Sequence, residues 1–311
     1  MDSPLVKQGG FKKKLKQIVR SWELYALLLP ALLFFVLFKY VPMYGIVMAF
    51  RKLSISGGFF SGEWVGLLYF KQLFTDPAFW NALRNTILIG LYKLVFYFPV
   101  PILIAILLNE IRLKWFRNVV QTIIYLPRFI SWVIMAGLVM NVLSANGGAL
   151  NNILGLFGVA PRSFLTEAGS FRAILVITTI IKDSGWSSII YFAAISSINP
   201  ELYEACAIDG GGRLRQMWHV TLPGLRPIIT IMLIMTVGTI LTQDTQQILT
   251  LYSPNVYSTG DIIGTYVYRT GIEYGRFSFA TAANLFNSVA ALILTLTANF
   301  VSSKVGDDTL F

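Results

Sequence analysis

The residues that could do chemistry in this 311-residue chain are charged and amide side chains within long apolar stretches. An unpaired cation inside a membrane span costs roughly 2.5–3.5 kcal/mol, so we expect such residues to face a cavity or a partner rather than lipid. In the stretch TQDTQQ at 242–247, the amides four residues apart share one face of the expected helix. We therefore predict that polar side chains line a translocation path. The predicted path residues are Lys93, Arg128, Lys182, Asp183, Trp186, Gln243, Asp244, Gln246 and Gln247.

Two environments are open for the three cations of this set, Lys93, Arg128 and Lys182. In the first, they pair with Asp183, Asp244, helix carbonyl ends or lipid headgroups. In the second, they line a cavity and raise the local concentration of an anionic solute. On the second interpretation we favour an anionic cargo.

The sequence contains no recognisable catalytic set and no metal-binding cluster. With one cysteine, Cys206, and one histidine, His219, the chain can form neither an internal disulfide nor a Cys/His metal site. It has no P-loop pattern GxxxxGK[ST] and no evident nucleophile, base and acid together. We expect neither an enzyme nor a bound cofactor, so the energy for transport must come from a partner.

The composition is that of a polytopic, all-α membrane protein. Hydrophobic residues make up 55% of the chain and charged residues only 13%. Six apolar runs are near or above the ~20 residues that a helix needs to cross a bilayer. The predicted spans cover about 24–50, 81–108, 119–143, 171–197, 225–250 and 278–302.

The distribution of lysine and arginine predicts that both termini are cytoplasmic, because positive residues near span ends are retained inside. The segments then placed inside carry Lys7, Lys12, Lys13, Lys14, Lys16, Arg20, Arg112, Lys114, Arg117, Arg213, Arg215, Arg226 and Lys304. The longer outside loops carry fewer. We assign 1–22 to a basic cytoplasmic N-terminus, 23–303 to the transmembrane domain and 304–311 to a cytoplasmic tail.

The polar stretch 199–227, NPELYEACAIDGGGRLRQMWHVTLPGLRP, separates the fourth and fifth spans. Its first part predicts a helix over 200–208 that is capped by Asn199 and begins with proline. Three glycines then break the helix, and a second short helix over 213–219 should end before Thr221. We predict a helix-turn-helix that docks a partner at the membrane surface. The alternative is an amphipathic loop that lies on the lipid headgroups.

This loop resembles the EAA loop of permease subunits of binding-protein-dependent ABC importers. The resemblance lies in Glu204-Ala205-Cys206, Asp209-Gly210-Gly211, Trp218, Val220-Thr221-Leu222-Pro223 and Pro227. The loop departs from the family pattern at Cys206 and Gly211, where alanine is usual, and at Met217, where phenylalanine is usual. The resemblance implies that its short helix seats in a groove of a cytoplasmic ATPase. The coupling residues so implied are Glu204, Ala205, Asp209, Gly210, Gly211, Trp218 and Pro223.

Further segments resemble carbohydrate importer permeases of the polysaccharide or lipoprotein type. They are FKYVPMYG (38–45), YLPRFIS (125–131), Gly185-Trp186 and IGTYVYRTGI (263–272). The chain departs from that subgroup at Arg128, where histidine is usual, and at 244–246. The resemblance implies a type I ABC importer permease fold in the bacterial plasma (inner) membrane. It also implies a second, homologous permease, two ATPases that bind ATP and Mg, and an extracytoplasmic solute-binding protein.

We therefore expect a permease subunit that translocates oligosaccharides, and we favour acidic uronate oligomers such as alginate or pectin fragments. Nucleic acid has no expected role. The alternatives are an ion-coupled secondary transporter of a small polar solute, or an intramembrane enzyme or scaffold. Only Asp183 and Asp244 among the acidic residues fall within spans, which argues against a carboxylate relay. A copurifying ATPase would separate the first hypothesis from the others.

Overall fold

The computed structural model describes residues 21–53 and 62–305, which are helical apart from turns, loops and one isolated bridge between Arg51 and Trp64. Four helices in this part are long and apolar enough to cross a membrane: Trp22–Phe50, Pro77–Glu110, Ala168–Ser196 and Phe277–Lys304. Two bent helix pairs supply two more crossings if each counts as one span. The predicted all-α polytopic fold is confirmed. The basic residues predicted at 1–20 and most of the predicted tail lie outside the described residues.

The first half of the chain contains α2 (Trp22–Phe35), the π segment η1 (Val36–Tyr40), α3 (Val41–Met43), the 3-10 segment η2 (Tyr44–Phe50), α4 (Leu68–Thr75), α5 (Pro77–Tyr92), the π segment η3 (Lys93–Tyr97), α6 (Pro99–Glu110), α7 (Lys114–Tyr125), the 3-10 segment η4 (Leu126–Phe129), α8 (Trp132–Leu143) and α9 (Ala149–Gly155). The second half contains α10 (Ala168–Ser196), α11 (Pro200–Ile208), α12 (Arg213–Gln216), the π segment η5 (Met217–Thr221), α13 (Leu222–Gly224), α14 (Arg226–Gly238), α15 (Thr245–Leu251), the 3-10 segment η6 (Pro254–Val256), α16 (Tyr257–Gly260), α17 (Ile263–Tyr268), the π segment η7 (Arg269–Glu273) and α18 (Phe277–Val305).

Three of the π segments end two residues before a proline. These prolines are Pro42 after η1, Pro99 after η3 and Pro223 after η5. In a regular helix the proline ring clashes with the carbonyl four residues earlier, and proline has no backbone N–H to donate to that carbonyl. A π turn holds one more residue and bonds five residues back, as from the Phe98 N–H to the Lys93 carbonyl at 3.0 Å. The wider turn accommodates the proline, so each helix continues.

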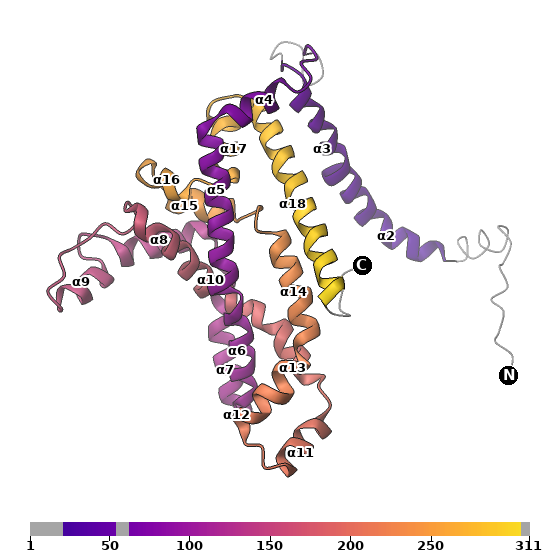
Figure 1. Ribbon diagram of the computed structural model, residues 1–311, viewed down its shortest axis with the longest axis vertical. Helices are drawn as coiled ribbons and strands as arrows, with labels where there is room; N and C mark the ends of the chain where they lie inside the picture. Colours follow the sequence, from indigo (N-terminus) through magenta and orange to yellow (C-terminus); the bar gives the residue numbers. More distant parts are fainter. Residues whose placement is uncertain (1–20, 54–61, 306–311) are drawn as a thin grey trace.

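The central element of the fold is α10, which packs most extensively against α6. Figure 1 shows α5 and α6 as one long column, with α18 and α14 beside it and the loop elements α11–α13 at the lower end. At mid-height α8 and α9 project to one side, and α2 leans away on the other side. Every residue of α2 is solvent-exposed in the isolated chain.

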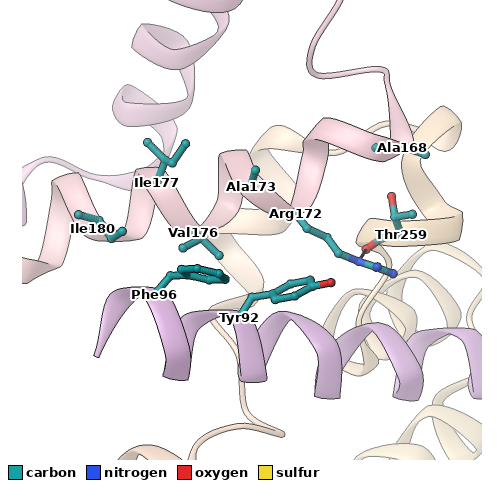
Figure 2. Close-up of a pocket in the computed structure, with 10 residues that line it drawn as sticks. Tyr92, Phe96, Ala168, Arg172, Ala173, Val176, Ile177, Ile180 and Thr259 are labelled. Carbon is teal, nitrogen blue, oxygen red and sulfur yellow. Dashed lines mark hydrogen bonds between the residues drawn. The ribbon is translucent and has the colours of Figure 1, made fainter. Parts of the chain in front are cut away.

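α5 and η3 also run beside the first half of α10, and a pocket of about 660 Å³ lies between them (Figure 2). Tyr92 and Phe96 line it from one side, and residues of α10 from Ala168 to Ile180 line it from the other. The pocket lies in the half of the molecule away from the α11–α13 loop.

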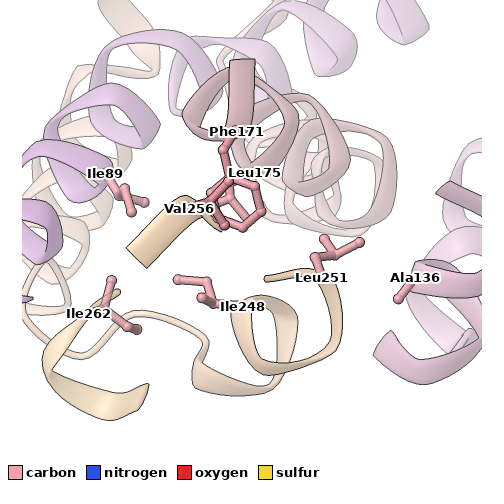
Figure 3. Close-up of a cluster of buried hydrophobic side chains, with 8 residues drawn as sticks. All are labelled: Ile89, Ala136, Phe171, Leu175, Ile248, Leu251, Val256 and Ile262. Atoms are coloured by element: carbon pink, nitrogen blue, oxygen red, sulfur yellow. The ribbon is translucent and has the colours of Figure 1, made fainter. Parts of the chain in front are cut away.

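A buried cluster ties α15 to α10, α5 and α8 (Figure 3). It contains Ile89, Ala136, Phe171, Leu175, Ile248, Leu251, Val256 and Ile262. In a bilayer, close packing holds such a cluster together, because lipid tails are as apolar as the side chains. Packing is tight enough that a Cβ on Gly260 would lie 2.3 Å from the Phe171 ring. The cluster fixes the position of α15 and of the polar residues at its start.

The predicted fifth span, 225–250, is not one helix. α14 ends at Gly238 and α15 begins only at Thr245, after a 59° bend between α13 and α14. The Asp244 carboxylate accepts the N–H groups of Gln246 and Gln247 at 3.1 and 3.3 Å, which starts a new helix. Our expectation that Gln243 and Gln247 share one face of a helix is therefore wrong, because Gln243 lies before the start of α15.

The predicted third span, 119–143, also breaks, with an angle of 103° between Lys114–Phe129 and Trp132–Leu143. Pro127 lies in the 3-10 segment η4 before the break. The Ser131 hydroxyl then accepts the Ile134 N–H at 3.3 Å and caps α8. Both breaks create backbone groups that need partners at membrane depth.

Candidate functional site

The two helix breaks meet one another through the Trp132 indole, whose Nε1 donates to Asp244 Oδ2. Trp132 is the first residue of α8, and Asp244 is the capping residue of α15. Trp132 is buried, whereas Asp244 is exposed. This contact joins the irregular parts of the third and fifth spans.

Gln247 is the hub of the buried polar network and is completely inaccessible to solvent. Its Nε2 donates to the Leu175 carbonyl at 2.8 Å, and also lies 2.9 and 3.0 Å from the hydroxyls of Thr178 and Thr179. Its Oε1 accepts a hydrogen bond from Lys93 Nζ at 2.9 Å. One amide thus links η3, α10 and α15 and supplies the polar partner of a cation inside a span.

Lys182 satisfies the backbone at the break of the third span. It is only 5% exposed, and its Nζ donates to the carbonyls of Pro127 at 3.4 Å, Arg128 at 3.1 Å and Ile130. The ammonium group also lies 5.3 Å from the centroid of the Trp132 ring, within the range of a cation–π interaction. Since free carbonyls at membrane depth are costly, this lysine stabilises the bend.

Arg128 and Asp183 form an ion pair of 2.7 Å at the edge of the same region. The arginine side chain is 48% exposed and the aspartate side chain 19%. Beside them, the rings of Phe129 and Trp186 meet edge to face with centroids 5.7 Å apart, and both are exposed. The arrangement presents a guanidinium, a carboxylate and two apolar rings on one surface.

The structure thus brings together Lys93, Lys182, Asp244 and Gln247 in one network, with Arg128, Asp183 and Trp186 in a second group beside it. Gln243 is placed apart from the network: its Nε2 donates to the Ile240 carbonyl of its own turn at 2.8 Å. Gln246 is exposed.

All three cations of the predicted path have polar partners in the structure. The first of the two environments, pairing with Asp183 and with helix carbonyls, is therefore the one observed, with the Gln247 amide as an additional partner. Because none of the three cations is without a polar partner, a preference for an anionic cargo cannot depend on an unpaired charge. It depends instead on Arg128, whose side chain is half exposed.

Sequence reasoning missed Trp132, Thr178, Thr179 and Phe129. Trp132 and Phe129 stand in apolar sequence and look like ordinary membrane-facing aromatics. The threonines precede Lys182 by four and three residues on the same helix, a spacing that places all three on neighbouring faces. That spacing could have identified the two threonines as members of the polar network.

The predicted first helix of the loop 199–227 is confirmed as α11 (Pro200–Ile208), with the Asn199 side chain accepting the Glu201 N–H at 3.1 Å. Gly210 has a positive φ of +77°, as a turn after a helix requires. A Cβ on Gly211 would lie 2.5 Å from the Cys206 sulfur. Gly210 therefore adopts a turn that a side chain would strain, and Gly211 leaves room for the neighbouring Cys206 side chain.

The second helix of the loop is longer than predicted. It continues from Arg213 to Gly224 through η5, so Thr221, Leu222 and Pro223 are helical, and it bends only at Leu225. The π turn described above explains why Pro223 does not end it. Arg213 pairs with Glu110 of α6 at 3.7 Å and so ties the loop to the transmembrane helices. Within the loop, the hydroxyls of Tyr203 and Thr221 hydrogen-bond at 3.0 Å and join α11 to η5.

The outer face of this loop is unusually apolar for an exposed surface. Leu202, Ile208, Leu214 and Trp218 are all exposed, Ile208 by 86%, and α11 buries none of its residues. Of the predicted coupling residues, Gly211 is buried, and the rest are exposed: Glu204, Ala205, Asp209, Gly210, Trp218 and Pro223. An exposed apolar face with a polar rim is typical of a contact surface for another protein or for a membrane.

The opposite end of the molecule is held by a buried ion pair. Arg269 and Asp261 lie 2.6 Å apart with exposed fractions of 10% and 4%, and the Arg269 guanidinium stacks 4.5 Å from the Tyr257 ring. Tyr266 donates to Asp76 at 2.5 Å. Burial, together with this bond, raises the pKa of Tyr266, so it remains a donor at neutral pH. Within the described ranges no group of His, Cys, Asp and Glu could hold a metal ion.

Residues 100–305 match the family described as "Binding-protein-dependent transport system inner membrane component". The polygalacturonan/rhamnogalacturonan transport system permease protein YteP of Bacillus subtilis is 40% identical over 311 residues, which cover 100% of this chain and 97% of that protein. Protein LplB of the same organism is 38% identical over 310 residues, covering 100% and 98%.

A chain of a bacterial ABC transporter involved in the import of the acidic polysaccharide alginate has the same fold. Its crystal structure matches with a TM-score of 0.87 and 42% identity, covering 94% of this chain and 99% of that one. The structure of a bacterial alginate ABC transporter in complex with an alginate pentasaccharide-bound periplasmic protein matches with a TM-score of 0.86 and 42% identity, covering 95% and 99%. The expected ABC importer permease fold is confirmed.

Proposed function

Since the chain belongs to the family of inner membrane components of binding-protein-dependent transport systems, we propose that it is the permease subunit of an ATP-driven importer of acidic oligosaccharides. The observation that carries the proposal is the meeting of two broken spans at Trp132 and Asp244, beside the half-exposed Arg128. Broken backbone at membrane depth is tolerated where it is buried in protein or lines a wet cavity.

The proposed cargo is a uronate oligomer such as a pectin or alginate fragment. Support comes from the relative named for polygalacturonan and rhamnogalacturonan and from the two alginate transporter structures. A planar guanidinium binds a carboxylate with two parallel hydrogen bonds, so a uronate can replace Asp183 at Arg128 during passage. The exposed rings of Phe129 and Trp186 offer apolar surface to the sugar ring.

Energy enters through the loop 199–227, whose exposed apolar face docks a cytoplasmic ATPase. Glu204 provides the charged contact, and Gly210 and Gly211 the close turn. Two such ATPases bind ATP and Mg, and they act on this chain and on a homologous second permease. A solute-binding protein delivers the cargo from outside. In this orientation both termini are cytoplasmic, and α4 and α17 lie at the outer end.

The test is ATP hydrolysis in proteoliposomes that contain this chain, the second permease and the ATPases, with the cognate binding protein added. We expect uronate oligomers to stimulate ATP hydrolysis, and we expect no stimulation by neutral glucans of equal length. Arg128→Gln should reduce stimulation by uronates at least tenfold, while Arg84→Gln, which removes an exposed arginine in α5 rather than in η4, should not. Stimulation by neutral glucans alone would overturn the acidic cargo, and failure of any ATPase to copurify would overturn the importer itself.

A further inference from the structure

The pocket between α5 and α10 has two chemically different ends (Figure 2). Phe96, Val176, Ile177 and Ile180 make one end apolar. At the other end Arg172 and Thr259 lie near the start of α10, and Figure 2 shows the Arg172 side chain extending towards Thr259. From Arg172 to Ile180, α10 rises about 12 Å at 1.5 Å per residue. The pocket is therefore long, apolar along most of its length and cationic at one end.

The charge of Arg172 is not neutralised within the described part of the chain. Its Nε donates to the Thr259 carbonyl at 3.1 Å, and NH2 donates to Asn85 Oδ1 at 2.8 Å. Both acceptors are neutral, and the four ion pairs of the described residues involve other arginines. Since these two bonds hold the guanidinium in place, its charge and remaining N–H groups are available to an anion. The N-terminus of the 29-residue helix α10 adds positive potential at the same place.

We propose that this pocket binds an anionic phospholipid, with the phosphate at Arg172 and one acyl chain along Phe96, Val176 and Ile177. An amphipathic ligand matches the lining, because the apolar wall offers an oligosaccharide few hydrogen-bond partners. A helix from a partner would cover the apolar wall, but it would compensate the Arg172 charge only if it placed a carboxylate there.

Such a lipid would support the path without contacting cargo. Phe96 lies in η3, the π segment that begins with Lys93, and α10 carries the threonines that surround Gln247. A lipid wedged between these two elements holds Lys93 and Gln247 at their observed separation. This inference does not depend on the identity of the cargo.

The test uses the complete importer complex in nanodiscs and measures copurifying lipid by native mass spectrometry. With equal phosphatidylglycerol and phosphatidylcholine, we expect retention of phosphatidylglycerol at least tenfold above phosphatidylcholine. Arg172→Gln should abolish that preference, and the exposed Arg84→Gln should keep it. Equal retention of both lipids by the wild-type complex would overturn the proposal, as would displacement of the lipid by inorganic phosphate.

A second measurement covers the case in which Arg172→Gln fails to fold. A photo-crosslinking residue at position 177 should form an adduct with the mass of a phospholipid. Ala173→Phe, which fills the pocket from an exposed position, should remove that adduct without changing the arginine. Crosslinking of position 177 to the second permease instead of lipid would show that a protein helix occupies the pocket and would overturn the proposal.

Discussion

Gln247→Leu should destabilise the transmembrane domain by about 2–4 kcal/mol, although it preserves side-chain size. Leucine leaves Lys93 Nζ and the Leu175 carbonyl without the amide at 2.9 and 2.8 Å. A lost hydrogen bond to a charged group accounts for about 1.5–3 kcal/mol and one between neutral groups for about 0.6–1 kcal/mol. Thr178 and Thr179 contribute little, because their hydroxyls keep their own carbonyl partners on α10 at 2.7 and 2.8 Å.

The adjacent residue provides the matched control. Gln246 is exposed while Gln247 is completely buried, so Gln246→Leu should change stability by less than about 0.5 kcal/mol. The measurement is reversible unfolding of each purified variant in mixed micelles of increasing SDS fraction, followed by tryptophan fluorescence. Equal stability losses in the two variants, or a loss below about 1 kcal/mol for Gln247→Leu, would refute the assignment of Gln247 as the hub.

Three further changes test other parts of the structure. Glu204→Lys reverses a charge at the proposed ATPase contact, where a like-charge pair costs several kcal/mol, so substrate-stimulated ATP hydrolysis should fall at least tenfold while membrane insertion stays normal. Normal uptake by that variant would contradict the coupling role. Gly210→Ala places a side chain at φ +77°, which costs roughly 1–2 kcal/mol, whereas Gly212→Ala at φ −70° should be tolerated. In uptake assays, Gly210→Ala should therefore transport less than Gly212→Ala. Asp261→Ala leaves Arg269 buried without its carboxylate and should cost about 3–5 kcal/mol, seen as a lower thermal midpoint; an unchanged midpoint would exclude a stabilising role for the pair.

Local sequence predicted the elements whose cause is local. α11 begins at Pro200 because Asn199 caps it, and the chain reverses at Gly210 because glycine adopts positive φ readily. The six apolar runs follow directly from the requirement that a span be about 20 residues long. These features depend on few residues, which are close together in the chain.

The partners within the site could not be predicted in this way, because they depend on contacts between distant segments. Lys93 and Gln247 are 154 residues apart, and Arg128 and Asp183 are 55 apart. The break before Asp244 was missed for a related reason: the apolar run continues on both sides of it, and the capping contact by which Asp244 begins α15 is visible only in the structure. The hydrophobic pattern indicates that a segment lies in the membrane, but it does not indicate where the helix is interrupted.

The π segments ahead of Pro42, Pro99 and Pro223 have a consequence for how insertions and deletions arise in relatives of this chain. Each π turn is equivalent to one residue inserted into an α-helix. Deleting a single residue from 94–97 would remove this extra residue, restore regular winding and leave the helical segments on either side in nearly the same register. Lys93 would keep its direction towards Gln247, but the ring of Pro99 would now clash with the carbonyl four residues before it. Length variation by one residue in these segments therefore has to arise together with a change at the following proline.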